Sequence, residues 1–150
     1  MKALIQRVKH ARVEADDTVI AGIETGYVVF LGIRSGDTFD DCRRLAGKTV
    51  KLRIFPDSNN RMSASITQVD GSVLVVPQFT LYADTSRGNR PGFTDAADPE
   101  TARELYELYV ASLRQYLGAG RVATGRFGAM MDVEIVNHGP VTLELTTDSD

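Results

Sequence analysis

The stretch ALIQRVKHARVEA, residues 3–15, alternates apolar and polar residues well enough to predict one long β-strand. Two shorter segments of the same kind follow it, TVIAGIE at 18–24 and YVVFLGIR at 27–34. The connections between them, ADD and TG, are short and polar, as expected for tight turns. The first part of the chain is therefore predicted to form a meander of three strands.

Two helices are predicted downstream of this meander. After the helix-start residues SGD at 35–37, apolar positions recur with helical spacing over 39–50. Asp98 is predicted to cap a second helix, with Pro99 at its first position, an apolar stripe up to Leu117, and GAG at its end. Cys42, the one cysteine, falls on the apolar side of the first helix, where a packed thiol is expected.

The rest of the chain is predicted to be strands and loops. LRIFPDSNNRM at 52–62 is interpreted as a short strand entering a polar turn, and residues 66–84 as a hairpin turning at Asp70-Gly71. The end of the chain, residues 121–148, is predicted to hold two strands around Gly139-Pro140. The sum is an α+β pattern in which helices cover antiparallel sheet, as a single domain over residues 1–150.

Charge and composition limit the function. A net charge of −3 argues against a protein that grips nucleic acid over its whole surface, although the local cluster RGNR at 87–90 could contact phosphate or be an ordinary solvated loop. No apolar run is long enough to span a bilayer and the amino terminus has no signal-peptide core, so a cytoplasmic location without a membrane partner is expected. One cysteine and two histidines make a Cys/His zinc site unexpected.

Common catalytic signatures are missing from the sequence. There is no G-x-S-x-G, H-E-x-x-H, P-loop or G-x-G-x-x-G motif. His10 and His138 are each better explained as surface or packed residues than as bases. The Thr80 hydroxyl could attack an ester only with a base nearby, and no neighbour in sequence supplies one. Arg7 is either an outward-facing charge or a site residue.

Three longer motifs and two shorter ones nevertheless occur in an order that resembles the D-aminoacyl-tRNA deacylase family. They are PQFTLYAD at 77–84, RPGFTDAA at 90–97 and NHGPVT at 137–142, with IQRV near the start and TGRFGAMM before the last strand. The resemblance runs from Met1 to about Leu145. It implies an α+β fold in which antiparallel sheets form a barrel-like core flanked by two main helices.

The same resemblance implies an activity. Members hydrolyse the ester that joins a D-amino acid, or glycine, to the 3′-terminal adenosine of tRNA, and they spare L-aminoacyl-tRNA. They are homodimers that need no cofactor and no metal. Each active site combines the Ser-Gln-Phe-Thr-Leu segment of one subunit with a Gly-Pro of the other, whose peptide bond is cis and whose carbonyls exclude an L side chain. The activating group is thought to be the 2′-hydroxyl of the terminal adenosine.

Residue by residue, the resemblance assigns a catalytic role to Gln78, Phe79 and Thr80, with backbone N–H groups around Gln78 and Phe79 stabilising the oxyanion. For Thr80 a substrate-contacting role is preferred to a nucleophilic one. The substrate-binding residues are expected to be Gly139, Pro140, Arg7 and Asn137.

One departure from the family pattern is Pro77, where serine is usual. Proline has neither the hydroxyl nor the backbone N–H of serine, so a serine hydroxyl at this position cannot be essential here. Two other classes of function stay open on the sequence: a related editing hydrolase that removes a wrong amino acid, and a non-catalytic RNA-binding module. The second class is disfavoured by the acidic balance and the low aromatic content.

Overall fold

The computed structural model describes residues 1–148 and contains two long helices and eight strands within that range. Residues 149 and 150, the end of the predicted domain, lie outside the described residues. The elements follow one another as β1 Lys2–Ala15, β2 Thr18–Ile23, β3 Gly26–Gly32, α1 Phe39–Lys51, β4 Phe55–Pro56, β5 Met62–Ala64, β6 Ser72–Pro77, η1 Phe79–Tyr82, α2 Pro99–Leu117, η2 Ala119–Arg121, β7 Val122–Thr124 and β8 Asp132–Thr146.

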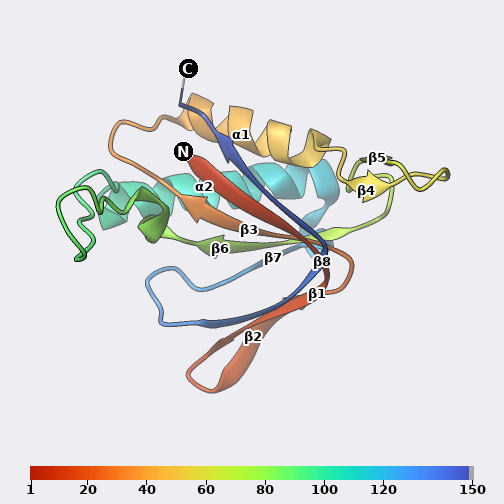
Figure 1. Ribbon diagram of the computed structural model, residues 1–150, viewed down its shortest axis with the longest axis horizontal. Helices are drawn as coiled ribbons and strands as arrows, with labels where there is room; N and C mark the ends of the chain where they lie inside the picture. Colours follow the sequence, from red (N-terminus) through yellow and green to blue (C-terminus); the bar gives the residue numbers. More distant parts are fainter. Residues whose placement is uncertain (149–150) are drawn as a thin grey trace.

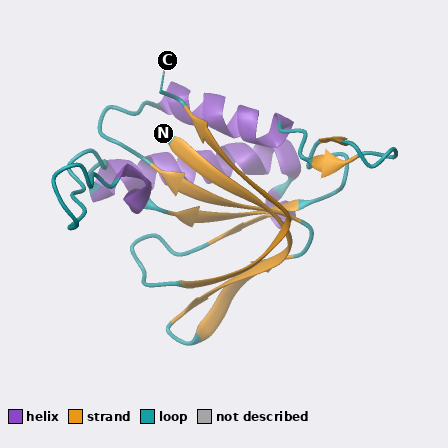
Figure 2. Ribbon diagram, viewed as in Figure 1, coloured by secondary structure: helices purple, strands orange, loops and turns teal. Residues whose placement is uncertain are grey.

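The long strand β1 organises the sheet. Its first half pairs antiparallel with β3 and its second half with β2, while β8 runs antiparallel along almost its whole length. Strands β6 and β7 continue the sheet beyond β3. Figures 1 and 2 show the sheet curling toward a barrel, with α1 and α2 side by side on one face. The predicted class, an α+β domain with a barrel-like sheet and two helices, is confirmed.

The two helices begin where the sequence predicted. Thr38 and Asp41 form a capping box at the start of α1, and the Asp98 carboxylate accepts hydrogen bonds from the backbone N–H groups of Glu100 and Thr101. These hydrogen bonds lower the pKa of both carboxyl groups below the usual range. The predicted packed thiol is also observed, because Cys42 is fully buried under α2.

The predicted hairpin at Asp70-Gly71 is wrong, and so is a purely antiparallel sheet. Residues 66–70 form turns, and β6 pairs in parallel with β3 on one side and with β7 on the other. The physical reason lies in the apolar run Val73–Val76, which is buried on both faces: Val73 and Val75 face the helices, whereas Leu74 and Val76 face a second core inside the curled sheet. A continuous apolar run of this kind is typical of a parallel strand.

Two strands were predicted around Gly139-Pro140, but β8 is assigned as one strand through this point. Its pairing with β1 is nevertheless interrupted there. Thr142 lies opposite Gln6 and Asn137 lies opposite Val8, so residues 138–141 face Arg7 alone. The sequence therefore located a bulge in the strand rather than its end.

Candidate functional site

The segment after β6 forms a single tight turn at the edge of the sheet. The backbone N–H of Gln78 donates to the carbonyl of Leu31, 2.8 Å away, which extends the ladder one residue past Pro77. The chain then enters the 3₁₀ turn η1, which begins at Phe79. Because Gln78 N–H points toward β3, the nitrogen of Pro77 points toward β7, whose pairing has already ended at Thr124. Proline is therefore tolerated at this position.

Backbone donors at the start of η1 are free. The first N–H groups of a helical turn have no partner inside it, and among residues 1–148 the N–H groups of Phe79 and Thr80 donate no recorded hydrogen bond. The N–H of Gln78 is used by Leu31. The pair of donors available to an oxyanion is thus Phe79 and Thr80, one residue later than the Gln78–Phe79 pair predicted from the sequence.

The side chains of Gln78 and Thr80 are hydrogen-bonded to each other, with the amide Nε2 donating to Oγ1. This amide is the recorded partner of the Thr80 hydroxyl within the described part of the chain, and an amide is not a base. The two histidines contribute no base to Thr80 either, since no contact joins them to it. Within residues 1–148, no base is hydrogen-bonded to the Thr80 hydroxyl to activate it as a nucleophile.

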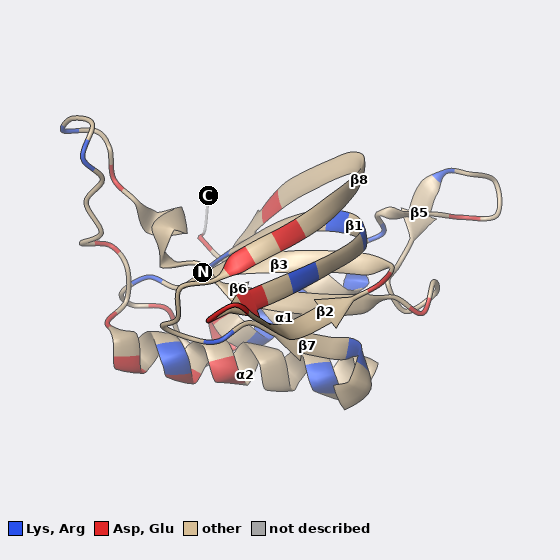
Figure 3. Ribbon diagram, turned by 90° about the horizontal axis from the view of Figure 1, so that it is seen from below, with Lys and Arg blue, Asp and Glu red and all other residues tan. Residues whose placement is uncertain are grey.

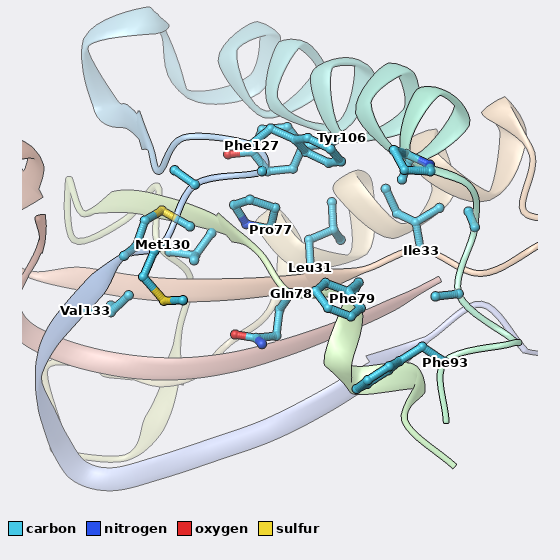
Figure 4. A pocket seen from close by; sticks show the side chains of 18 residues that line it. Leu31, Ile33, Pro77, Gln78, Phe79, Phe93, Tyr106, Phe127, Met130 and Val133 are labelled. Atoms are coloured by element: carbon cyan, nitrogen blue, oxygen red, sulfur yellow. The ribbon is translucent and has the colours of Figure 1, made fainter. Parts of the chain in front are cut away.

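An apolar pocket of about 710 Å³ opens next to this turn. Figure 4 shows Phe79 and Phe93 at its lower rim, Met130 and Val133 at another side, and Tyr106 and Phe127 under α2. Phe79 and Phe93 pack edge to face with ring centroids 5.0 Å apart. Phe79 is nevertheless 57% exposed, so much of its ring is open to a ligand. A pocket of this size and lining suits a flat aromatic group.

Gly32, the last residue of β3, sets how closely η1 packs on the sheet. A Cβ at Gly32 would lie 2.9 Å from Cβ of Leu81 and 3.2 Å from the carbonyl oxygen of Gln78. Leu81 belongs to η1 and Gln78 directly precedes it, so Gly32→Ala is expected to displace the free donors and to lower kcat about 10- to 100-fold. The free energy of unfolding, measured in urea, should change little. Gly120→Ala is the matched control, because a Cβ at Gly120 has no neighbouring atom within 4 Å. An unaltered kcat would contradict this role.

Arg7 holds the bulge of β8 in place. Its Nε donates to the carbonyl of His138 at 3.0 Å and its Nη1 donates to the carbonyl of Ile54 at 2.6 Å. The side chain is buried, with the residue only 8% exposed. A Cβ on Gly139 would lie 2.9 Å from the Arg7 Nη2 atom. Arg7 is therefore a buried side chain that fixes the bulge by hydrogen bonds, and it is not the outward-facing charge that the sequence left possible.

The Gly139–Pro140 peptide bond is cis, and Gly139 has φ +128°, a backbone conformation that other residues rarely adopt. Both residues are exposed. Asn137, at the base of the bulge, donates through Nδ2 to the Thr142 hydroxyl at 2.8 Å, while its Oδ1 is buried without a partner in the described structure. The four predicted substrate-binding residues thus gather in one place.

The two halves of the predicted site do not meet within one chain. Pro77, Leu31 and Ala3 lie in one row across the sheet, whereas the bulge lies opposite Arg7, four residues further along β1. Five residues of strand and three strand spacings separate Gln78 from Pro140, a distance of roughly 20 Å along the sheet. Gln78 and Pro140 therefore lie far apart within the described chain.

Metal-binding clusters and membrane spans were sought in the same residues. Across residues 1–148, no three His, Cys, Asp or Glu side chains come close enough together to hold a metal ion. Neither long helix in that range is sufficiently apolar over its length to cross a membrane. The expected cytoplasmic location stays a prediction.

Comparison with known proteins decides the family. A family model described as D-Tyr-tRNA(Tyr) deacylase matches residues 4–146. The chain belongs to this deacylase family. Deacylases are ester hydrolases, so the prediction of an enzyme of this class is confirmed.

Curated deacylase relatives are similar over nearly the whole chain. A D-aminoacyl-tRNA deacylase from Marinobacter nauticus is 50% identical over 145 residues, covering 97% of this chain and 93% of its own length. Another from Azoarcus sp. strain BH72 is 51% identical, covering 97% and 95%.

Solved structures share the deacylase fold. One named c-Myc DNA unwinding element binding protein superposes with a TM-score of 0.95 at 36% identity, covering 99% of this chain and all of its own. A probable eukaryotic D-amino acid tRNA deacylase superposes with a TM-score of 0.86 at 17% identity, covering 96% and 97%. The second likeness shows the fold alone.

Sequence reasoning missed most of the deacylase pocket. Phe93, Phe127 and Met130 occur in the motifs that resemble the family but were not predicted to line a site, and Met130 is 91% exposed at the pocket mouth. The available signal was a methionine and aromatic residues beside glycines in the loops, which sequence alone cannot distinguish from core residues.

Proposed function

We propose that this protein hydrolyses the ester between a D-amino acid and the 3′-terminal adenosine of tRNA, and that it also takes glycyl-tRNA. The observation that carries the proposal is the pair of free N–H groups of Phe79 and Thr80 at the lip of an apolar pocket. In a chain of the deacylase family, this arrangement provides an oxyanion site beside a place for an adenine ring. Hydrolysis at such an oxyanion site requires no protein nucleophile.

The reaction is a simple hydrolysis. A water oxygen attacks the ester carbonyl carbon, and the negative charge that develops on the carbonyl oxygen is stabilised by the two N–H donors. The bond to the 3′-oxygen then breaks, and this oxygen takes the proton that the water loses. With no base beside Thr80, the 2′-hydroxyl of the adenosine is the group that activates the water.

In this proposal, the partner subunit of a homodimer distinguishes D from L aminoacyl groups. The exposed bulge at Gly139-Pro140 lies too far from Gln78 to act in its own site, so we assign it to the site of the partner subunit in a homodimer. Backbone carbonyls there hold the substrate amino group and leave no room for an L side chain. Glycine passes because it has no side chain to clash, which is discrimination against the wrong substrate rather than a tight fit to the right one.

Hydrolysis of D-Tyr-tRNA, L-Tyr-tRNA and Gly-tRNA tests this proposal directly. With each substrate at equal concentration, the rates with the D-tyrosyl and glycyl esters should exceed the L-tyrosyl rate by at least about 100-fold. The spontaneous loss of each ester is subtracted. Equal rates with the D and L esters would overturn the chiral part of the proposal and would leave a general esterase.

The alternatives predict different results. An editing hydrolase that removes a wrong amino acid would select by side-chain size, so it would cleave L esters of one residue type. A non-catalytic RNA-binding module would bind tRNA without cleaving any ester. The free donors beside the pocket favour a hydrolase over the binding module, and the family match over residues 4–146 favours the deacylase over another editing hydrolase.

A further inference from the structure

The loop of residues 85–91 projects from the body of the protein beside the pocket. It is closed at its base by two backbone hydrogen bonds of 2.8 Å between Asp84 and Gly92. Figure 3 shows basic residues at the far end of this projecting loop. The next residue after the base is Phe93, which lines the pocket and touches Phe79. The loop is therefore rooted at the pocket rim.

Arg87 and Arg90 in this loop differ from most arginines of the chain. The other arginines of the chain mainly form ion pairs, donate to carbonyl groups or stack on a ring. Those with such partners are Arg7, Arg12, Arg34, Arg43, Arg44, Arg53, Arg103, Arg121 and Arg126. Within residues 1–148, Arg87 and Arg90 have no ion pair or side-chain hydrogen bond and are exposed.

The acidic groups near the loop do not neutralise them. Asp84 accepts a hydrogen bond from the backbone N–H of Ser86 at 2.8 Å, which lowers the pKa of its carboxyl group and keeps it ionised within the base of the loop. Asp98 caps α2. Asp95 follows Phe93 on the far side of the base, and its backbone carbonyl is held by Ser35. The loop tip itself carries two positive charges and no negative one.

The reach of the loop suits a strand that leaves the pocket. Arg87 is three positions after Asp84 and Arg90 is two positions before Gly92, so their Cα atoms lie within about 10 Å and about 7 Å of the loop base. An arginine side chain extends this reach further, to the first nucleotides beyond a base held between Phe79 and Met130. Guanidinium groups match phosphate oxygens in charge and geometry.

We propose that Arg87 and Arg90 bind phosphates of the tRNA 3′ strand that leads away from the terminal adenosine. This inference rests on the proposed function and adds to it a site for the nucleic-acid backbone, outside the chemistry. It explains how a protein of net charge −3 binds RNA, since only a small patch near the pocket has to be positive.

Two measurements test the loop with the double variant R87A/R90A. In direct binding of uncharged tRNA over a range of KCl, its affinity should fall about tenfold at low salt. Two lost phosphate contacts at about 0.7 each should also flatten the slope of log affinity against log salt by about 1.4. The matched control is R61A/R114A, which removes two other exposed arginines without recorded partners. Arg61 lies in the β4–β5 hairpin, at the opposite end of the molecule in Figure 1.

Hydrolysis of two substrates separates this inference from the proposed function. R87A/R90A should raise KM for D-Tyr-tRNA about tenfold and leave hydrolysis of D-tyrosyl-adenosine, which has no phosphate, unchanged. The inference is overturned if the variant and the control bind tRNA alike, or if the small ester is affected equally. A wild-type protein that cleaves neither D ester would instead refute the proposed function, and the tRNA-binding comparison would still decide the role of the loop.

Discussion

A D-aminoacyl-tRNA that ends in 2′-deoxyadenosine is expected to lose at least about 100-fold of the acceleration that this protein gives to ester hydrolysis. The reason is the surroundings of Thr80, whose hydroxyl is hydrogen-bonded to an amide and has no base near it in the described structure. Acid–base assistance typically contributes 10²–10⁴-fold, and here the RNA hydroxyl is the group that can supply it. The measurement is single-turnover hydrolysis of the two esters.

The comparison needs two controls. A 2′-deoxy ester also hydrolyses more slowly by itself, so each enzymatic rate is divided by its own spontaneous rate. Competition binding with the uncleaved 2′-deoxy ester should give an affinity close to that of the normal ester. The loss of acceleration would then lie in the chemical step and not in binding. Undiminished acceleration would transfer the role to Thr80, and Thr80→Val would then have to abolish the activity.

Arg7→Lys is expected to weaken both the fold and the chiral discrimination. Lysine has a single charged nitrogen, which cannot occupy the positions of both the Nε and the Nη1 atoms that donate to His138 and Ile54. Each hydrogen bond from a charged group contributes about 1.5–3 kcal/mol, so the free energy of unfolding should fall by about 3 kcal/mol. The released bulge should lower kcat/KM for D-Tyr-tRNA at least tenfold and reduce the ratio of D to L rates.

Lys9→Ala is the control for Arg7→Lys, because Lys9 lies on the same strand, carries the same charge and is exposed. Lys9→Ala should leave the free energy of unfolding in urea and the ratio of D to L hydrolysis rates unchanged. A merely structural role for Arg7 would lower the D and L rates equally. An Arg7→Lys variant with the wild-type stability and the wild-type ratio of D to L rates would show that the two hydrogen bonds of Arg7 are unnecessary.

The helices and the first three strands could be predicted because their signals are local. The Asp98 cap, Pro99 and the apolar stripe fix α2, and the alternation over residues 3–15 marks β1. The failed hairpin at Asp70-Gly71 shows the limit of such signals. A turn dipeptide was visible, but the partner of β6 is β3, more than forty residues earlier, and no local pattern encodes this pairing.

The candidate site was predictable only in part. Gln78 to Thr80 and Gly139-Pro140 were found through their resemblance to family motifs, not through chemistry that the residues show. The pocket could not be predicted, since its lining comes from β3, β6, η1, α2, β8 and the loops between them, which only the fold brings together. Which N–H groups are free depends on the hydrogen bond from Gln78 to Leu31, which is a property of the sheet.

The position of Pro77 in the sheet determines which residues are tolerated there. Its nitrogen faces the side of β6 where no neighbouring strand remains to be paired, and its ring contributes to the pocket wall. Serine and proline are therefore both compatible with the ladder at this position. A different side chain at residue 77 would alter the shape and wetness of the pocket and leave the donors of the following turn in place.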